Sequence, residues 1–319
     1  DLTFKPFLYY AAIEHGFTPS TPLRSELTTF TFDDGRATYT PHNYNDYYAN
    51  GPITLAQALA VSDNVFAVKT LKFIGADKLI ETAKTLGITS KLKAVPSLAL
   101  GTSPVKMIDM VAAYSTIANY GKKTEPVFIK KVIDANGNVL YEHQPSTQQV
   151  IDRDAAFVTA HLMTGMFDPK LNGYTTVTGQ SIIDEITRPY AGKSGTTKTD
   201  SWMIGFTPQL VAGVWTGYDR GETISRFDEK QYAKQIWVRF MEQSLADKPK
   251  KSFKPTKGVI GVYIDPQNGK LATDACPVKR KTYYLIGTEP TDYCTDHLEK
   301  KTKKKEDEKS WFEKWFPWF

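Results

Sequence analysis

Residues 191–219 read AGKSGTTKTDSWMIGFTPQLVAGVWTGYD, which divides into three short runs of strand-forming residues joined by tight turns. Successive strands with such short connections pair in antiparallel fashion, so this stretch predicts a three-stranded antiparallel sheet. The segment QYAKQIWVRFMEQSLA at residues 231–246 then has the apolar periodicity of an amphipathic helix. We expect this helix to lie across the sheet.

The chain before the sheet is mainly helical in pattern. Glycines end several of its apolar-periodic segments, as helix stop signals do. Residues 127–145 differ, because two alternating runs flank Asn136-Gly137, a strong hairpin signal. Helices, a hairpin and a meandering sheet predict an α+β fold with an antiparallel sheet flanked by helices. The helical segments are residues 1–16, 53–75, 77–88, 103–121 and 152–167.

The first of these helices, DLTFKPFLYYAAIEHG, carries a lysine in an otherwise apolar run. Phe4, Phe7, Leu8 and Ala11 share one helical face, and Lys5 sits beside that face at the start of the helix. A lysine in this place is either solvated or recruited for chemistry.

Composition places the chain among ordinary globular proteins and argues against nucleic acid as a partner. Of 319 residues, 41% are hydrophobic and 24% charged, and the formal net charge is only +5. No uninterrupted apolar window is long enough to span a bilayer, and no signal peptide opens the chain. Because the sequence starts inside a helix, we expect it to be a piece of a longer protein.

The C-terminal part of the chain differs in composition from the part before it. Prolines and lysines at 248–257 indicate a linker, and residues 258–277 predict a small strand-turn-strand unit. We therefore divide the chain into a main domain at 1–247, a small C-terminal β extension at 248–298, and a charged and aromatic tail at 299–319. The runs of basic residues near the C-terminus account for much of the net positive charge.

The cysteines and histidines do not predict a metal site. Cys276 and Cys294 are compatible with a disulfide closing one loop or with two reduced thiols. The histidines are scattered without the paired spacing of a zinc site, so we expect neither a metal nor a cofactor. These histidines are His15, His42, His143, His161 and His297.

Three short motifs occur in order along the chain: Lys5 within TFKP, Ser62-Asp63-Asn64, and KSGTT from Lys193. Each alone is a common tripeptide and carries little information. Together they match the S-x-x-K, S-D-N and K-T-G signature of penicillin-binding proteins and class A β-lactamases, with Ser194 in place of threonine. From Thr3 to about Leu245 the sequence resembles the transpeptidase domain of bifunctional, class A penicillin-binding proteins, which implies an all-helical subdomain beside the sheet.

The resemblance also assigns roles to these residues. A serine hydroxyl needs a base within hydrogen-bond reach, and Lys5 is placed for that role if burial and neighbouring cations lower its pKa. Ser62 would relay a proton to the leaving amine, and Asn64 would offer its amide to the substrate backbone. Asp63 would point away and hold the turn, while Lys193 would help to keep Lys5 neutral and attract an anionic substrate terminus.

The strand edge after Lys193 is expected to bind substrate. Gly195 would let an extended peptide approach and add as an extra strand. By the resemblance, the Ser194 and Thr196 hydroxyls would hold the substrate carboxylate, and the Thr196 N–H would contribute to an oxyanion hole.

The nucleophile position departs from the family pattern. Where the family reads GSTFKP, this chain has Asp1 and Leu2. Leucine cannot attack a carbonyl, and Thr3 would be rotated by about 100° away from a cleft facing position 2. The departure reflects either altered first residues, since two strands that precede this helix in the family are also missing, or a true inactive variant.

The resemblance implies a D,D-transpeptidase that cross-links peptidoglycan stem peptides through an acyl-serine intermediate and is inhibited by β-lactam antibiotics. The parent protein would be anchored at the extracytoplasmic face of the bacterial cell membrane and linked to a glycosyltransferase domain. Two alternatives remain open: a catalytically inactive peptide-binding module with the same cleft, which Leu2 supports, and a serine β-lactamase.

Overall fold

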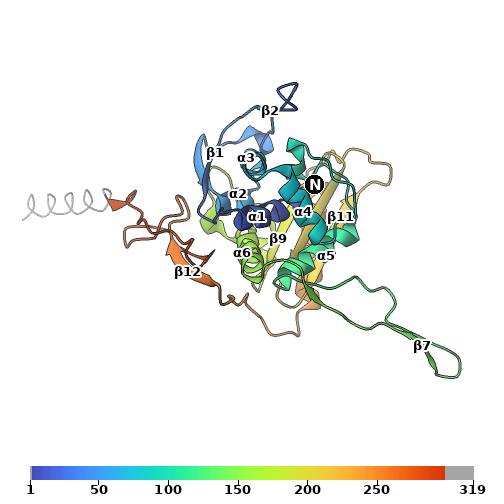
Figure 1. Cartoon of the computed structure of the whole chain (residues 1–319). Coiled ribbons are helices and arrows are strands. Elements are labelled where there is room, and N and C mark those ends of the chain that lie inside the picture. Colours follow the sequence, from blue (N-terminus) through green and yellow to red (C-terminus); the bar gives the residue numbers. More distant parts are fainter. Residues whose placement is uncertain (1, 299–319) are drawn as a thin grey trace, which may run out of the picture.

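The computed structural model describes residues 2–298, and its helices and strands form the α+β arrangement expected from the sequence (Figure 1). The tail at 299–319 lies outside the described residues, as does Asp1. Within residues 2–298, no helix combines the length and apolar character needed to cross a bilayer.

The predicted three-stranded antiparallel sheet is confirmed. It consists of β9 (Ala191–Thr196), β10 (Asp200–Phe206) and β11 (Val211–Gly217), in the order β11-β10-β9. Side chains of β10 alternate between two cores, as the period of a strand requires: Trp202, Ile204 and Phe206 face the main core, and Met203 joins a second core beneath the last helix. This places β9 at an edge of the sheet within the described chain.

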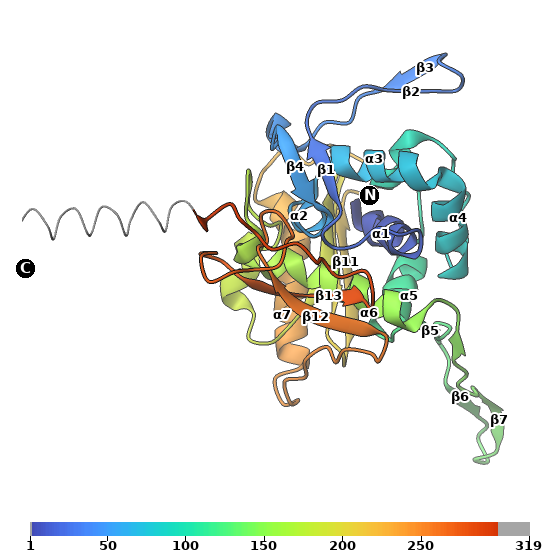
Figure 2. The same cartoon turned by 60° about the vertical axis from the view of Figure 1, so that its left-hand side comes forward.

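The last helix, α7 (Tyr232–Ser244), packs across β10 and β11 as expected (Figure 2). Its Trp237 is fully buried and donates its indole N–H to the Ala212 carbonyl, 3.1 Å away. The close approach depends on Gly205, because a side chain there would run into the Trp237 ring.

Helices on the other face of the sheet form the main core. The opening segment is a 3-10 turn, η1 (Leu2–Phe4), that continues into α1 (Lys5–Glu14), and α1 is buried from Lys5 to Ile13. Such burial all round explains its lack of a polar face. The other helices are α2 (Leu55–Val61), α3 (Asn64–Ile74), α4 (Ala76–Thr85), α5 (Met107–Ala118) and α6 (Arg153–Met163). Short 3-10 turns are η2 (Tyr44–Asp46), η3 (Pro96–Leu100), η4 (Thr164–Phe167), η5 (Pro169–Leu171), η6 (Gln180–Glu185) and η7 (Glu229–Gln231).

The helical pattern of residues 53–75 resolves into two helices. Thr54 caps α2 in a capping box with Gln57, and Ser62 ends α2 in the left-handed conformation, with φ 60° and ψ 45°. Asp63 then caps α3 by accepting the Phe66 N–H. The S-D-N motif therefore sits at a sharp break between two helices.

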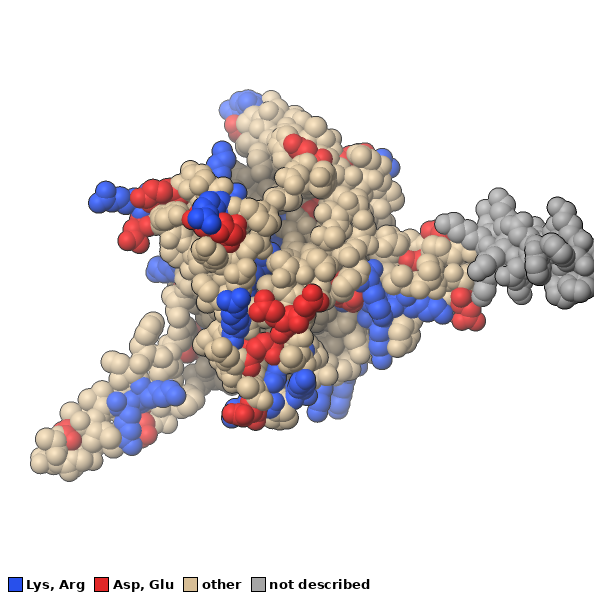
Figure 3. All heavy atoms as spheres, turned by 180° about the vertical axis from the view of Figure 1, so that it is seen from behind, with Lys and Arg blue, Asp and Glu red and all other residues tan. Residues whose placement is uncertain are grey.

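Short strand pairs surround this body. The hairpin predicted around Asn136-Gly137 is present and projects away from the domain (Figure 2). Both acidic and basic side chains lie on it and on the neighbouring face, where the acidic ones gather in one band (Figure 3). The hairpin strands are β6 (Lys131–Ile133) and β7 (Val139–Glu142), and the other pairs join β1 (Pro22–Ser25) to β4 (Gly51–Thr54), β2 (Phe30–Phe32) to β3 (Ala37–Tyr39) and β5 (Lys122–Lys123) to β8 (Gln148–Gln149).

The C-terminal segment contains a longer-range strand pair than the sequence suggested. β12 (Val259–Ile264) is followed by the expected turn, which closes with a bridge between Ile264 and Leu271. Its full antiparallel partner, however, is β13 (Arg280–Leu285), outside the predicted unit at 258–277. The alternating burial of β13, which packs on α6, explains why this later run is the partner. Cys276 and Cys294 are free thiols, and both are buried.

Candidate active site

Lys5 lies at the centre of a polar cluster inside the domain. Its side chain is 0% exposed, at the junction of η1 and α1. Its Nζ lies 2.7 Å from Asn64 Oδ1, 2.9 Å from the Ser62 carbonyl, 3.1 Å from Ser62 Oγ and 3.1 Å from the Asp63 carbonyl. Two of the three sequence motifs are thus joined by direct hydrogen bonds.

The helix break at Ser62 makes these contacts possible. Because α2 ends in a left-handed residue, the chain turns and points the Ser62 and Asp63 carbonyls at the lysine instead of continuing a helical hydrogen-bond ladder. Asn64 completes the cluster: its Oδ1 faces Lys5, and its Nδ2 donates to the His42 carbonyl at 2.7 Å. One N–H of that amide remains for another acceptor.

Asp63 faces away from Lys5 and holds the turn, in the orientation that the sequence suggested. The residue is 1% exposed, and its carboxylate accepts the Phe66 N–H at 2.7 Å and the Tyr174 hydroxyl at 2.7 Å. Ser25 Oγ and Asn43 Nδ2 also donate to it. These donors satisfy the buried carboxylate and hold the turn between α2 and α3 in place.

Asn43 is a supporting residue that the sequence analysis missed. Its Nδ2 donates to Asp63 at 2.9 Å, while its Oδ1 accepts the backbone N–H of Asn64 at 2.7 Å. Ser25 and Tyr174 also contact Asp63, yet they lie 38 and 111 residues away from it in sequence. No local sequence pattern marks such long-range partners.

Lys193 approaches the cluster from the sheet. It is 0% exposed on β9, and its Nζ donates to the Ser194 carbonyl at 2.6 Å. Burial, together with the charge of Lys234 on α7, lowers the pKa of Lys193 to about 7. Burial also lowers the pKa of Lys234 to about 8, and its Nζ donates to the Thr178 carbonyl. Lys234 was not among the predicted site residues.

The environment of Lys5 favours its neutral form. Burial holds the pKa of Lys5 well below its usual range, the charge on Lys193 lowers it further, and Asp63 opposes both. A neutral amine keeps two N–H groups for the surrounding carbonyl oxygens and gains a lone pair that can accept a proton. Chemically, the cluster can take a proton from a hydroxyl placed beside Lys5.

The remaining predicted residues follow Lys193 along β9. Ser194 pairs with Met203 of β10, Gly195 with Trp202 and Thr196 with Ser201. Ser194 is buried, whereas Thr196, at the end of the strand, is exposed. These three residues thus occupy the edge strand next to η1, which β9 contacts.

Leu2 is the position that the family pattern gives to the nucleophile. It begins η1, three residues before Lys5, and side chains three residues apart lie on the same side of a 3-10 turn. Thr3 is turned by about 120° from that direction, is 1% exposed, and accepts the Tyr114 hydroxyl on its carbonyl at 2.6 Å. Thr3 is therefore closed to a substrate, whereas Leu2 is only partly buried.

Comparison with known proteins shows which family this chain resembles. Residues 3–242 match the family described as penicillin binding protein transpeptidase domain, and residues 255–299 match the C-terminal domain of penicillin-binding protein 1A. Penicillin-binding protein 2D of Bacillus subtilis is 56% identical over 98% of this chain and 46% of its own length. Penicillin-binding protein 1A of Aquifex aeolicus is 33% identical over 92% of this chain and 39% of its own length.

Solved structures show the same fold. The crystal structure of penicillin-binding protein 1A from Haemophilus influenzae superposes with a TM-score of 0.82 at 26% identity, covering 92% of this chain and 48% of that one. The PonA1 protein of Mycobacterium tuberculosis in complex with penicillin V superposes with a TM-score of 0.67 at 25% identity, covering 80% of this chain and 72% of that one. The chain spans less than half the length of the curated relatives named above.

Proposed function

The chain belongs to the penicillin-binding protein transpeptidase family, and on that premise we propose that it is the D,D-transpeptidase domain of a peptidoglycan-synthesising protein. In this proposal a serine at position 2, where this sequence has Leu2, attacks the carbonyl of the penultimate D-alanine of a stem peptide. Terminal D-alanine leaves, and an amine of a neighbouring strand takes the acyl group from the serine. β-Lactam antibiotics would acylate the same position.

The observation that carries the proposal is the buried Lys5 amine, held among Ser62 and Asn64 with a lowered pKa. A structural lysine in a core is normally paired with a carboxylate, but the nearest carboxylate, Asp63, is engaged by other donors. A neutral amine beside a hydroxyl is instead the arrangement of a general base.

The other roles follow from position. Ser62 Oγ, within hydrogen-bond distance of Lys5, would pass the proton on to the leaving amine. Asn64 would donate its second amide hydrogen to the substrate backbone. Ser194, Gly195 and Thr196 on the sheet edge would bind the extended peptide and its carboxylate, and Lys193 would attract that carboxylate.

Leu2 favours a second candidate, a peptide-binding module without catalysis. The sequence as it stands has no hydroxyl over Lys5, so it would bind a stem peptide or a β-lactam without forming an acyl-enzyme. The two candidates differ in one side chain, which makes them separable.

The test is a gain of function by Leu2→Ser. We expect the variant to form a covalent adduct with a fluorescent penicillin that survives denaturation, while the parent chain with Leu2 forms none. Adding Lys5→Met to Leu2→Ser should slow labelling by about 10²–10⁴-fold, because the general base is removed. Circular dichroism would verify that each variant is folded.

Absence of any adduct in a folded Leu2→Ser variant would contradict the transpeptidase proposal and favour the binding module. Rapid loss of the adduct with turnover of the penicillin would point instead to a β-lactamase. A stable adduct that releases D-alanine from a synthetic stem peptide supports the transpeptidase.

We further propose that the parent protein is anchored at the extracytoplasmic face of the bacterial cell membrane and carries a glycosyltransferase domain. Support comes from the relatives, of which this chain spans less than half. The substrate would then be the stem peptide of newly made glycan strands.

A further inference from the structure

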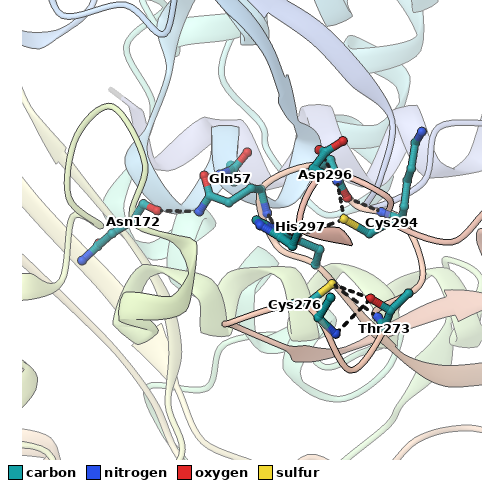
Figure 4. A network of polar contacts seen from close by, with 12 residues as sticks. Gln57, Asn172, Thr273, Cys276, Cys294, Asp296 and His297 are labelled. Atoms are coloured by element: carbon teal, nitrogen blue, oxygen red, sulfur yellow. Dashed lines mark hydrogen bonds and ion pairs between the residues drawn. The ribbon is translucent and has the colours of Figure 1, made fainter. Parts of the chain in front are cut away.

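Four possible metal ligands converge in the C-terminal extension. In the sequence they lie far from the TFKP, S-D-N and KSGTT motifs. They are Asp265, Cys276, Cys294 and His297, and one possible ligand atom from each lies within 4.8 Å of all the others. Both cysteines and Asp265 are buried, and His297 is partly buried. Figure 4 shows Cys276, Cys294 and His297 gathered between adjacent loops of the extension.

We propose that these four residues bind a structural Zn²⁺ ion. Tetrahedral zinc, with bonds of about 2.0–2.3 Å, places its ligand atoms roughly 3.3–3.8 Å apart, so the cluster needs only small movements to close on the metal. Two thiolates with an imidazole and one carboxylate oxygen suit zinc better than the hard cations, which prefer oxygen alone. Four protein ligands leave no open position, as is typical of a structural site.

The backbone around each ligand orients it toward the others. Asp265 follows β12, and its Oδ1 accepts the Gln267 N–H at 2.9 Å, which leaves Oδ2 to face His297 Nε2 at 2.7 Å and Cys294 Sγ at 3.4 Å. The Cys294 N–H donates to the Leu271 carbonyl at 2.8 Å and fixes the second loop beside the first. The four ligands therefore come from three loops pinned together by main-chain hydrogen bonds.

Each sulfur also has N–H donors of the kind that stabilise a metal-bound thiolate. Asn268 Nδ2 lies 3.1 Å from Cys294 Sγ, and the Thr273 N–H lies 3.3 Å from Cys276 Sγ. Asn268 is itself held by Asp296 at 2.8 Å. Outer contacts of this kind orient metal ligands and tune their basicity.

The size of the extension explains why a metal would be needed. In residues 255–298 of the extension, the buried apolar side chains besides the two cysteines are Ile264, Pro266 and Tyr284. A unit of about 40 residues with so small a core generally requires a disulfide, a metal or an external partner. The sequence expectation of no metal considered pairs of histidines, and it overlooked the C-x-x-H spacing of Cys294 and His297.

The site also lies beside the transpeptidase domain. Gln267, two residues after Asp265, accepts the Gln57 side-chain amide at 3.4 Å and donates to the Asn172 carbonyl at 3.0 Å. Gln57 belongs to α2, the helix that ends at Ser62. Zinc would thus fix the loop that braces the helix leading to the S-D-N turn.

The first experiment measures zinc in the purified chain, prepared with a reductant and without chelators. We expect about one zinc per chain by mass spectrometry of the metal, and less than about a tenth of that in Cys294→Ser or Asp265→Asn, because each variant removes a ligand. Asp274→Asn, an exposed carboxylate that is not one of the four ligands, is the matched control for Asp265→Asn and should retain the metal.

A second readout guards against variants that fail to fold. The metal-free parent chain, titrated with Co²⁺, should show visible bands of tetrahedral cobalt and near-ultraviolet thiolate-to-cobalt charge transfer, and Zn²⁺ should abolish both. Chelation should lower the midpoint of thermal unfolding by several degrees, and added Zn²⁺ should restore it.

One result would overturn the proposal: a chain with both thiols reduced that takes up neither Zn²⁺ nor Co²⁺. The same holds for a chain that is isolated with a disulfide between Cys276 and Cys294 and is then reduced.

Discussion

A buried lysine is the residue on which the proposed chemistry depends. Lys5 has no exposure to water, so its ammonium form would lose hydration that three carbonyl oxygens and a hydroxyl replace only in part. The second buried lysine, Lys193, adds repulsion. The two lysines are thus electrostatically coupled, since the charge of Lys193 helps to keep Lys5 neutral.

This linkage predicts a bell-shaped pH dependence for acylation of the Leu2→Ser variant by a penicillin. On the acid side Lys5 becomes protonated and cannot accept the hydroxyl proton, so the second-order rate constant falls as the pH decreases through the pKa of Lys5. On the alkaline side Lys193, with a pKa of about 7, loses the charge that attracts the penicillin carboxylate, so the rate constant falls above that pH. Rates from fluorescent-penicillin labelling over a pH series measure both limbs.

Lys234 offers a control for the alkaline limb. Its charge contributes to the low pKa of Lys193, so Lys234→Gln should raise that pKa and move the alkaline limb to higher pH. Lys250→Gln removes the same charge from an exposed position and should leave the limb in place. Equal shifts in both variants would assign the limb to net charge instead of to Lys193.

At the scale of elements, close contacts between the sheet and its helices set the position of β9. Gly205 in β10 lies under Trp237 of α7, and a Cβ at Gly205 would also lie 2.8 Å from the Ala191 carbonyl of β9. Gly205→Ala should therefore lower the free energy of unfolding by about 1–3 kcal/mol, the usual range for overpacking. Urea unfolding followed by tryptophan fluorescence measures the change.

Gly51→Ala in β4 is the matched control for this prediction. There the nearest heavy atom to a new Cβ is the Ala49 carbonyl oxygen at 3.9 Å, an ordinary contact. We expect its effect to stay within about 0.5 kcal/mol. If Gly205→Ala lowers the free energy of unfolding as little as Gly51→Ala does, β10 and α7 can move apart without cost and the prediction is wrong.

Local pattern predicted the elements well and their long-range partners poorly. Short runs of strand-forming residues between tight turns identified β9, β10 and β11, and the Asn136-Gly137 turn identified the hairpin, because these signals lie within a few residues. The partner of β12 was misjudged because the intervening loop is long. The donors to Asp63 and the cluster around Cys294 were missed for the same reason, since each joins segments that only tertiary folding brings together.

At the scale of the whole molecule, the C-terminal extension and the transpeptidase domain are joined by a few specific hydrogen bonds. Ser20 Oγ donates to the Gly269 carbonyl at 2.6 Å and lies 2.6 Å from the Tyr284 hydroxyl. Gly269 has φ +72°, and a side chain there would run into Ser20 and Thr54. The loop after Asp265 is therefore fitted closely to the domain.

Ser20→Ala should loosen this junction without disturbing the sheet of the main domain. Loss of two partly buried hydrogen bonds would lower the free energy of unfolding by about 1 kcal/mol each. The extension would be destabilised most, because its own core is small. We expect amide hydrogens of β12 and β13 to exchange about thirtyfold faster, while those of β10 keep their protection. Ser146→Ala, at an exposed serine before β8, should change neither group. Equal acceleration in β10 and β13 would instead show that the two parts unfold as one unit, so that the extension has no separate opening for the junction to control.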